Sequence, residues 1–271
     1  MHHEKVIIIG GGPSGIACAV QLKRYGIDPL LIEKNEIGGL VKNAWRLDNY
    51  PGYPQGIKGV DLACKLKEHL DRFEIRYQKN EIRKLKYSGN RFHLESDNDI
   101  FKCDFVVVAT GTKPKHTGDG YTEVYPLRNA NGKRIAIVGA GDAAFDYAMT
   151  LSLHNTIHIH NRGSKIKCIP ALLKITLKQG SISYFENSSP SDSYDYTIFA
   201  TGREPDLDLM TEELKKKQAQ LEQQGLLYII GDVKNGMVRQ TSVATGDGIR
   251  AAMAIVEYIH ADEGNQQDTG T

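Results

Sequence analysis

Three glycines, Gly10, Gly12 and Gly15, have the Gly-x-Gly-x-x-Gly spacing that could bind a phosphate-bearing cofactor. They follow an apolar run at residues 6–9 and open a helical pattern over residues 14–25. In such a strand–turn–helix unit the first glycine permits the tight turn, the second lets the backbone approach a pyrophosphate, and the third lets the helix pack on the strand. The helix N-terminus offers free N–H groups to the phosphates. This turn is therefore predicted to bind a dinucleotide.

An acidic residue, Glu33, ends the second apolar run and stands 23 residues after Gly10. At that place its carboxylate can accept hydrogen bonds from the adenosine ribose of the dinucleotide. The alternative is a glycine-rich turn with no ligand. The combination of strand, helix and terminal acid favours the dinucleotide site over that alternative.

A second motif, Gly139-x-Gly141-x-x-Ala144, repeats the strand–turn–helix context after an apolar run at residues 134–138. An alanine at the last position slightly widens the gap between helix and strand. The residues that this motif predicts on a second nucleotide are Gly139, Gly141, Asp142, Ala143 and Ala144.

The nucleotide preference of the second site depends on the end of its second strand, residues 156–160. His160 stands there in place of an acid, and Arg162, Lys165 and Lys167 follow. A cation at this edge suits a 2′-phosphate, which favours NADPH over NADH. In the alternative interpretation Arg162 is a solvated surface residue.

A third element, the pair Gly231-Asp232, ends a short apolar run beside the first predicted site. The Asp232 carboxylate could accept a hydrogen bond from a ribityl hydroxyl. On its own the pair is a weak signal, because Gly-Asp is common in turns.

The elements that position these residues occur twice in the chain, which is the main organisational fact. Ala109-Thr110-Gly111 ends one apolar run, and Ala200-Thr201-Gly202 ends another. The pattern predicts an α/β fold of two Rossmann-like, three-layer dinucleotide-binding domains.

Further elements complete this scheme. We expect an amphipathic helix with Leu62, Leu66, Leu70 and Phe73 on one face, and antiparallel strands between residues 76 and 103. A closing helix is expected over residues 249–260. Its buried stripe would be Ile249, Ala252, Met253, Val256 and Ile259. The tail at 261–271 is expected to be polar and mobile.

Composition narrows the function classes. The 271 residues suit two modest domains, and 34 Lys and Arg balance 33 Asp and Glu. Because positive and negative charges are balanced, the composition gives no indication of binding to nucleic acid or to an anionic membrane. No apolar run is long enough to cross a bilayer. The N-terminus leads directly into a strand, so we expect no signal peptide.

Four cysteines, Cys18, Cys64, Cys103 and Cys168, are widely spaced and form no Cys-x-x-Cys. A reducing, cytoplasmic location is therefore expected. His154, His158 and His160 could suggest a metal, but no acid or cysteine completes a ligand set, so none is predicted. The basic clusters at 83–86 and 215–217 are expected to be solvated faces, with a docking patch for an acidic carrier as the alternative.

The combined motifs resemble the thioredoxin reductase group of flavoproteins, which includes a class of ferredoxin–NADP reductases. Matching segments, in the same order and at similar spacing, are residues 10–15, 33, 38–39, 49–52, 109–111, 139–144, 200–202, 231–232 and 239–241. The resemblance implies an FAD-binding domain of residues 1–113 and 206–271, with an NAD(P)H-binding domain inserted at 114–205. It also implies a homodimer.

The resemblance adds residues to the first site. Leu40 and Asn49 would lie along the flavin, Ile82 near the adenine, and Gln240 and Thr241 at the pyrimidine end of the ring, unless these last two are ordinary helix caps. With the motifs, the predicted FAD set is Gly10, Gly12, Pro13, Ser14, Gly15, Glu33, Gly39, Leu40, Asn49, Ile82, Ala109, Thr110, Gly111, Gly231, Asp232, Gln240 and Thr241.

Two departures from the family pattern matter. The family's thioredoxin reductases carry Cys-x-x-Cys shortly before the second glycine motif, where this chain has residues 122–125, Thr-Glu-Val-Tyr. Only 35 residues separate Arg162 from Ile198, so the second domain is trimmed.

The predicted function is hydride transfer from NADPH to flavin N5, followed by electron transfer to an external acceptor such as a ferredoxin, a flavodoxin or a quinone. No protein side chain is predicted to act as a catalytic acid, base or nucleophile, because the flavin carries the chemistry. The hinges would lie near residues 111–112 and 202–203. One alternative is a flavin-binding protein with a regulatory role and weak or lost NAD(P)H activity. Another is a disulfide or peroxide reductase that uses Cys168 or Cys64.

Overall fold

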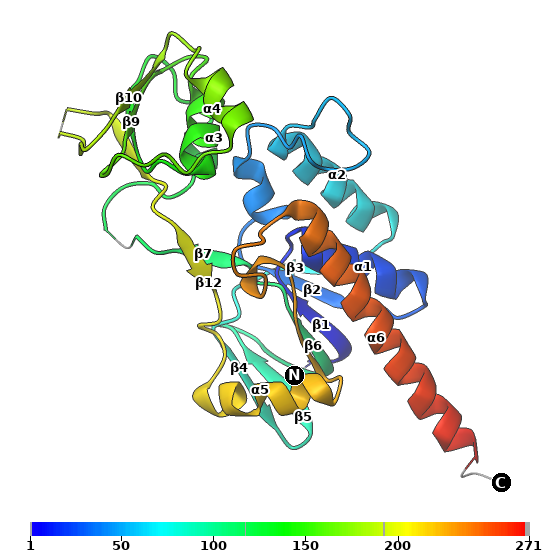
Figure 1. The fold of residues 1–271 in the computed structure, drawn as a ribbon. Helices are drawn as coiled ribbons and strands as arrows, with labels where there is room; N and C mark the ends of the chain where they lie inside the picture. The colour runs from blue at the N-terminus through cyan, green and yellow to red at the C-terminus, as the bar shows by residue number, and fades with distance from the viewer. Residues whose placement is uncertain (1, 117, 192, 269–271) are drawn as a thin grey trace. The chain divides into compact units, whose positions relative to one another are not determined.

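The computed structural model describes residues 2–116, 118–191 and 193–268 (Figure 1). Contacts divide the chain into two compact units. Unit 1 contains Met1–Val41, Leu62–Lys113 and Pro205–Thr271, and unit 2 contains Lys42–Asp61 and Pro114–Glu204. In both units helices pack on a sheet, so the predicted α/β class is confirmed.

Unit 1 is built on a seven-stranded sheet with the order β3-β2-β1-β6-β5-β4, in which β13 also pairs with β6. Its strands are β1 (His2–Ile9), β2 (Leu30–Glu33), β3 (Arg76–Lys79), β4 (Lys84–Ser88), β5 (Arg91–Glu95), β6 (Ile100–Val108) and β13 (Leu227–Ile229). The long strand β6 divides the sheet. Its first part pairs antiparallel with β5, and its last part pairs parallel with β13.

The central strands of unit 1 have continuous apolar segments at residues 6–9, 30–32 and 105–108, which is typical of a parallel sheet covered on both faces. On one face the core includes Ile7, Ile32 and Val106 under Leu214 and Leu221 of α5 (Glu212–Gln223). Helix α1 (Pro13–Arg24) packs on β1 and β2. On α2 (Gly59–Arg72), the predicted apolar face is confirmed for Leu62, Leu66 and Leu70, which are buried, whereas Phe73 lies just beyond the helix and is half-buried.

Helix α6 (Thr241–Asp268) lies beside α1 (Figure 1). A Cβ at Gly248 would collide with the carbonyl oxygen of Ser14, so glycine permits this close approach. The sequence prediction for this helix was wrong in two respects. It extends beyond residues 249–260 at both ends, because nothing between Thr241 and Asp268 breaks a helix. Ile249 is 43% exposed and lies outside the buried stripe.

Unit 2 has a parallel four-stranded sheet with the order β10-β9-β8-β11. Its elements are β8 (Arg134–Val138), α3 (Asp142–Leu151), β9 (Thr156–His160), α4 (Pro170–Thr176), β10 (Ile182–Phe185) and β11 (Tyr196–Phe199). Helices α3 and α4 pack against each other in Figure 1. The predicted strand at 156–160 is confirmed, and the short α4 stands between β9 and β10.

Strands β7 (Thr112–Pro114) and β12 (Arg203–Pro205) form a separate two-stranded sheet. The chain passes from unit 1 to unit 2 within β7 and returns to unit 1 within β12, and these are two of its passages between the units. The N–H of Lys115 donates to the carbonyl of Gly202, and the N–H of Asp206 donates to the carbonyl of Gly111. These passages lie within three residues of the positions that the sequence predicts as hinges.

Residues 42–61 differ from the sequence-based division, which assigns them to the first domain, because in the structure they pack within unit 2. Asn43 Oδ1 accepts hydrogen bonds from the N–H groups of Val124 (3.1 Å) and Tyr125 (2.9 Å). Asp146 of α3 accepts one from the N–H of Trp45 at 2.8 Å. These contacts join residues about 80 to 100 positions apart, which a local pattern does not reveal.

Two further findings concern single elements. Strand β3 pairs parallel with β2, so the expectation of antiparallel pairing holds only for β4, β5 and the first part of β6. Among the described residues no helix is both long and apolar enough to cross a membrane.

Candidate functional site

The first glycine turn joins β1 to α1, and steric limits explain two of its three glycines. Gly10 has φ +114°, and a Cβ there would collide with the carbonyl oxygen of Ala109 at the end of β6. A Cβ at Gly15 would collide with the carbonyl oxygen of Gly10. Gly12 is different, because a Cβ on it would meet no atom within 4 Å. The turn is therefore tight on its protein side and open at Gly12.

The open side of this turn meets the start of α1. Gly12 is the N-cap and has no side chain to cap the helix, and Pro13 is the first helical residue. A second glycine segment lies alongside, since the N–H of Gly38 donates to the carbonyl of Gly11 at 2.8 Å and a Cβ on Gly39 would lie 3.2 Å from the Cα of Gly12. Backbone without side chains thus forms both walls, as a pyrophosphate site requires.

Glu33 is half-buried at the end of β2 and reaches this turn. Its Oε2 accepts a hydrogen bond from the N–H of Gly11 at 2.6 Å, and its Oε1 accepts one from the N–H of Asn35 at 2.7 Å. The strand end therefore places the carboxylate at the turn, as the sequence analysis expects of a ribose ligand.

Asp232 follows Gly231, which packs directly on the start of α1. A Cβ at Gly231, where φ is +74°, would lie 2.5 Å from Ser14 Oγ. Asp247 of α6 holds this turn, since its Oδ2 accepts hydrogen bonds from the N–H of Gly231 (3.2 Å) and from Asn235 Nδ2 (2.6 Å). Sequence reasoning missed Asp247, although an acid between two glycines of a helix is a signal for it.

The other predicted FAD residues in unit 1 have varied surroundings. Thr110 Oγ1 donates to the carbonyl of Asp206 at 2.6 Å, beside Gly111. Ile82 is 8% exposed and belongs to the core of unit 1. Leu40 lies in the short 3-10 helix η1 (Gly39–Asn43).

At the start of α6, Gln240 precedes the helix and Thr241 is its first residue. The carbonyl of Gln240 accepts a hydrogen bond from the N–H of Ala244, so its backbone forms part of the helix start. Asn49 is exposed and belongs to unit 2.

The second glycine turn, between β8 and α3, repeats the geometry of the first. Gly139 has φ +143°, and a Cβ there would lie 2.5 Å from the carbonyl oxygen of Ala200 at the end of β11. Gly141 is the N-cap of α3, and a Cβ on it would meet no atom within 4 Å. Ala144 is completely buried. The two halves of the sequence thus build the same open turn twice.

The segment after β9 runs beside this second turn. The N–H of Lys167 donates to the carbonyl of Ala140 at 2.8 Å, and the N–H of Ile169 donates to Asp142 Oδ1 at 2.7 Å. Asp142, Ala143 and Arg162 are exposed.

His160, which replaces the strand-end acid, is buried and fully hydrogen bonded. Its Nδ1 lies 2.9 Å from Ser188 Oγ, and its Nε2 lies 2.8 Å from the Tyr194 hydroxyl, which also lies 2.8 Å from His158 Nδ1. Burial lowers the pKa of both imidazoles. This hydrogen-bond network joins β9 to the residues that follow β10. Among the described residues no group of three His, Cys, Asp or Glu side chains could hold a metal ion.

Comparisons with known proteins agree with this geometry. The model of the pyridine nucleotide-disulphide oxidoreductase family matches residues 4–180. The chain belongs to this family. It is 24% identical to a thioredoxin reductase of Coxiella burnetii, over 95% of this chain and 97% of that protein. It is also 24% identical to a protein of Pseudomonas fluorescens named glucosaminate ammonia-lyase, over 96% of this chain and 97% of that protein.

The fold of this family member matches solved structures over nearly its whole length. A thioredoxin reductase of Lactococcus lactis aligns with a TM-score of 0.81 at 20% identity, covering 95% of this chain and 99% of that chain. A bacillithiol disulfide reductase of Staphylococcus aureus aligns with a TM-score of 0.71 at 20% identity, covering 97% and 99%. The protein is thus a pyridine nucleotide oxidoreductase of the thioredoxin reductase-like type.

The four cysteines of this oxidoreductase are free thiols. Cys18 and Cys103 are buried, and burial raises the pKa of both thiols far above the usual value. Burial also raises the pKa of the half-buried Cys168 to about 12, and Cys64 is exposed on α2. A thiol with a raised pKa is a poor nucleophile.

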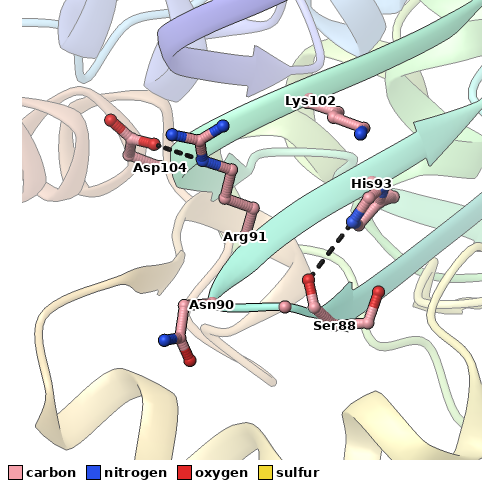
Figure 2. A pocket seen from close by; sticks show the side chains of 7 residues that line it. Ser88, Asn90, Arg91, His93, Lys102 and Asp104 are labelled. Carbon is pink, nitrogen blue, oxygen red and sulfur yellow. Dashed lines mark hydrogen bonds and ion pairs between the residues drawn. The ribbon is translucent and has the colours of Figure 1, made fainter.

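A hollow of about 640 Å³ lies in unit 1, away from the first glycine turn (Figure 2). It is lined by Ser88, Gly89, Asn90, Arg91, His93, Lys102 and Asp104, around the turn from β4 to β5 and the first half of β6. Ala109, which contacts the first turn, follows the other end of β6. Seven residues of extended chain from Lys102 to Ala109 span roughly 20 Å, so this hollow is separate from the family's nucleotide site.

The basic clusters are neutralised in part by neighbouring carboxylates. Arg83 pairs with Asp97 at 2.7 Å, Lys86 with Glu95 at 2.5 Å, and Lys215 with Glu212 at 2.8 Å. The Arg83 and Lys215 pairs are exposed and the Lys86 pair is half-buried, which is typical of the edges of solvated faces.

Proposed function

We propose that this protein is an FAD-containing NADPH oxidoreductase that passes electrons to an external acceptor without a redox disulfide. The observation that carries the proposal is the pair of turns at Gly12 and Gly141, each open at a helix N-terminus. One chain that builds this turn twice suits two dinucleotides. We assign FAD to unit 1 and NADPH to unit 2.

The residues of unit 1 fit FAD. The backbone at Gly12 and Gly39 would receive the pyrophosphate, because a side chain on Gly12 would enter the open space beside the turn and one on Gly39 would crowd the backbone of Gly12. Glu33 would bind the adenosine ribose and Asp232 the ribityl chain. When bound, FAD supplies the ring that accepts a hydride equivalent and releases electrons to an acceptor.

The residues of unit 2 fit a phosphorylated nicotinamide nucleotide. Gly141 and the first turn of α3 would receive the pyrophosphate, and Arg162 would bind the 2′-phosphate. A guanidinium forms charge-assisted, bidentate contacts with phosphate, and Arg162 is exposed on the segment that runs beside the second turn. This arrangement favours NADPH over NADH.

The absence of Cys-x-x-Cys determines the kind of acceptor. Residues 122–125 contain no cysteine, and two of the four thiols are buried with raised pKa values. Disulfide exchange would require a paired, reactive thiol. We therefore propose an acceptor that takes electrons from the flavin itself, such as a small one-electron carrier protein, a quinone or a dye. By resemblance we also propose a homodimer, which light scattering after gel filtration tests. The widely spaced cysteines suit a cytoplasmic location.

An anaerobic titration of the purified protein with NADPH, and separately with NADH, tests the proposal. We expect a yellow protein whose flavin absorbance is bleached by NADPH at lower concentration than by NADH. A screen of ferredoxin, flavodoxin, quinones and thioredoxin should then find turnover with electron carriers and none with thioredoxin. A colourless protein that takes up no FAD contradicts the assignment.

The small size of unit 2 favours a second candidate function. Among the described residues between β9 and β11, α4 and β10 are the only helix and strand, so this unit provides less chain around a nucleotide than the family pattern implies. A flavin-binding protein with a regulatory role would contain FAD but would not be bleached by either nicotinamide nucleotide. The same titration separates the two candidates.

A further inference from the structure

Asn161 lies directly after β9 and is a buried polar residue, 8% exposed. Its side chain makes three hydrogen bonds. Oδ1 accepts from the N–H of Gly163 at 3.1 Å, while Nδ2 donates to the Tyr184 hydroxyl at 2.8 Å and to the carbonyl of Lys165 at 3.3 Å. One side chain therefore closes the turn 161–165 on itself and joins it to β10.

The backbone of this turn is also anchored. The N–H of Asn161 donates to the carbonyl of Phe185 at 2.9 Å, and its carbonyl accepts from the N–H of Ser188 at 3.0 Å. The N–H of Asn187 donates to the carbonyl of Gly163 at 3.2 Å. The turn thus has a fixed base on β10 and the residues that follow it.

The turn presents cations beside the second glycine motif. Arg162 and Lys165 are exposed, and in the part of the chain that the structure describes neither forms an ion pair. The N–H of Lys167 donates to the carbonyl of Ala140, which fixes the far end of the segment at that motif. His160 is not available to a ligand, because both its ring nitrogens are already hydrogen bonded.

We propose that Asn161 is a positioning residue for nucleotide selectivity, which holds Arg162 and Lys165 ready for the 2′-phosphate of NADPH. This inference rests on the proposed NADPH function. Asn161 acts through the turn rather than by touching the nucleotide. Without its side chain the cations would remain, but the turn would have to be ordered when the phosphate binds, at a cost in affinity.

Isothermal titration of the FAD-loaded protein with 2′,5′-ADP and with 5′-AMP tests this role, since these probes differ only in the 2′-phosphate. Asn161→Ala should weaken binding of 2′,5′-ADP about tenfold and change binding of 5′-AMP by less than about twofold. In an Arg162→Ala background the same substitution should have much less effect on 2′,5′-ADP, because the two residues act on one contact.

Asn155→Ala is the matched control. Asn155 is also a buried asparagine of unit 2, 7% exposed, with three hydrogen bonds to backbone groups of Lys133, Ala130 and Leu151. It precedes β9, at the end opposite to Asn161. Its loss should destabilise the unit and leave the ratio of the two affinities unchanged. If Asn161→Ala does not fold, Tyr184→Phe removes one partner of the side chain and should lower the same ratio.

The outcomes are distinct. A wild-type protein that binds both probes equally contradicts the proposed NADPH preference itself. A wild-type preference for 2′,5′-ADP that Asn161→Ala, or Tyr184→Phe in its place, leaves unchanged overturns the positioning role alone. An undiminished effect of Asn161→Ala in the Arg162→Ala background also overturns it.

Discussion

The carboxylate of Glu33 accepts a hydrogen bond from the N–H of Gly11 at 2.6 Å, and this contact joins the end of β2 to the first glycine turn. We predict that Glu33→Ala and Asp232→Ala each yield protein depleted of FAD, because each removes a carboxylate that would bind a sugar hydroxyl. A hydrogen bond to a charged group contributes about 1.5–3 kcal/mol, or roughly 10- to 100-fold in affinity. The ratio of flavin to protein absorbance measures the loss. Fully yellow protein from both variants contradicts these roles.

Gly12→Ala should separate cofactor binding from folding. Gly12 has φ −81°, and a Cβ there meets no atom of the protein, so the loss of stability should be limited to the cost of alanine at an N-cap, about 1 kcal/mol. The added methyl would occupy the space of the pyrophosphate, so FAD binding should fall sharply. Thermal unfolding and flavin content measure the two effects.

Gly10→Ala is the contrasting substitution at the same turn. It combines φ +114° with a collision against the Ala109 carbonyl, and it should prevent correct folding. Normal FAD content in Gly12→Ala would show that the open side of the turn does not receive the pyrophosphate.

We predict that the carboxyl of Asp146 makes the stability of unit 2 depend on pH. Burial raises its pKa to about 7, against the lowering effect of hydrogen bonds from the N–H groups of Trp45 and Arg46. The unfolded carboxyl ionises near pH ~4, so between about pH 4 and pH 7 the folded state holds more protons. The contribution of Asp146 to the free energy of unfolding therefore falls as pH rises from about 4 to 7, by up to about 1.4 kcal/mol per pH unit.

Asp146→Asn keeps an acceptor for Trp45 and removes the titration. The free energy of unfolding is measured by urea at about pH 5 and at about pH 8, for the wild-type protein and for Asp146→Asn. The change between the two pH values in the wild type, minus the same change in the variant, is the contribution of Asp146. The wild-type protein should lose more stability between these pH values than Asp146→Asn does. Equal losses would show that Asp146 does not titrate in this range.

The Rossmann-like turns could be predicted from sequence because their requirements are local. A buried strand, glycines at fixed spacing and a following helix leave few alternatives, and the bounds of β9 were predicted as the structure has them. Gly10 lies against Ala109 and Gly139 lies against Ala200, and both contacts follow from the same duplicated pattern.

The rest depends on contacts between distant parts of the chain. Asp247 binds the Gly231 turn across 16 positions, and Asn161 reaches Tyr184 across 23. The packing of residues 42–61 within unit 2 likewise involves the hydrogen bonds that Asn43 accepts from Val124 and Tyr125 and the one that Asp146 accepts from Trp45. Such contacts leave no periodic signal in the sequence, so pattern analysis does not identify them.

The central claim is that FAD alone stores the electrons of this protein. An anaerobic dithionite titration of the purified, FAD-loaded protein measures it most directly, because it counts the electrons taken up per flavin before excess reductant appears. FAD without a redox disulfide takes up about two electrons, and a flavin beside an active disulfide takes up about four. We predict about two, unchanged after alkylation of the accessible thiols. Uptake of about four electrons, reduced to two by alkylation of the reduced protein, would contradict the account and assign a cysteine pair to the reaction.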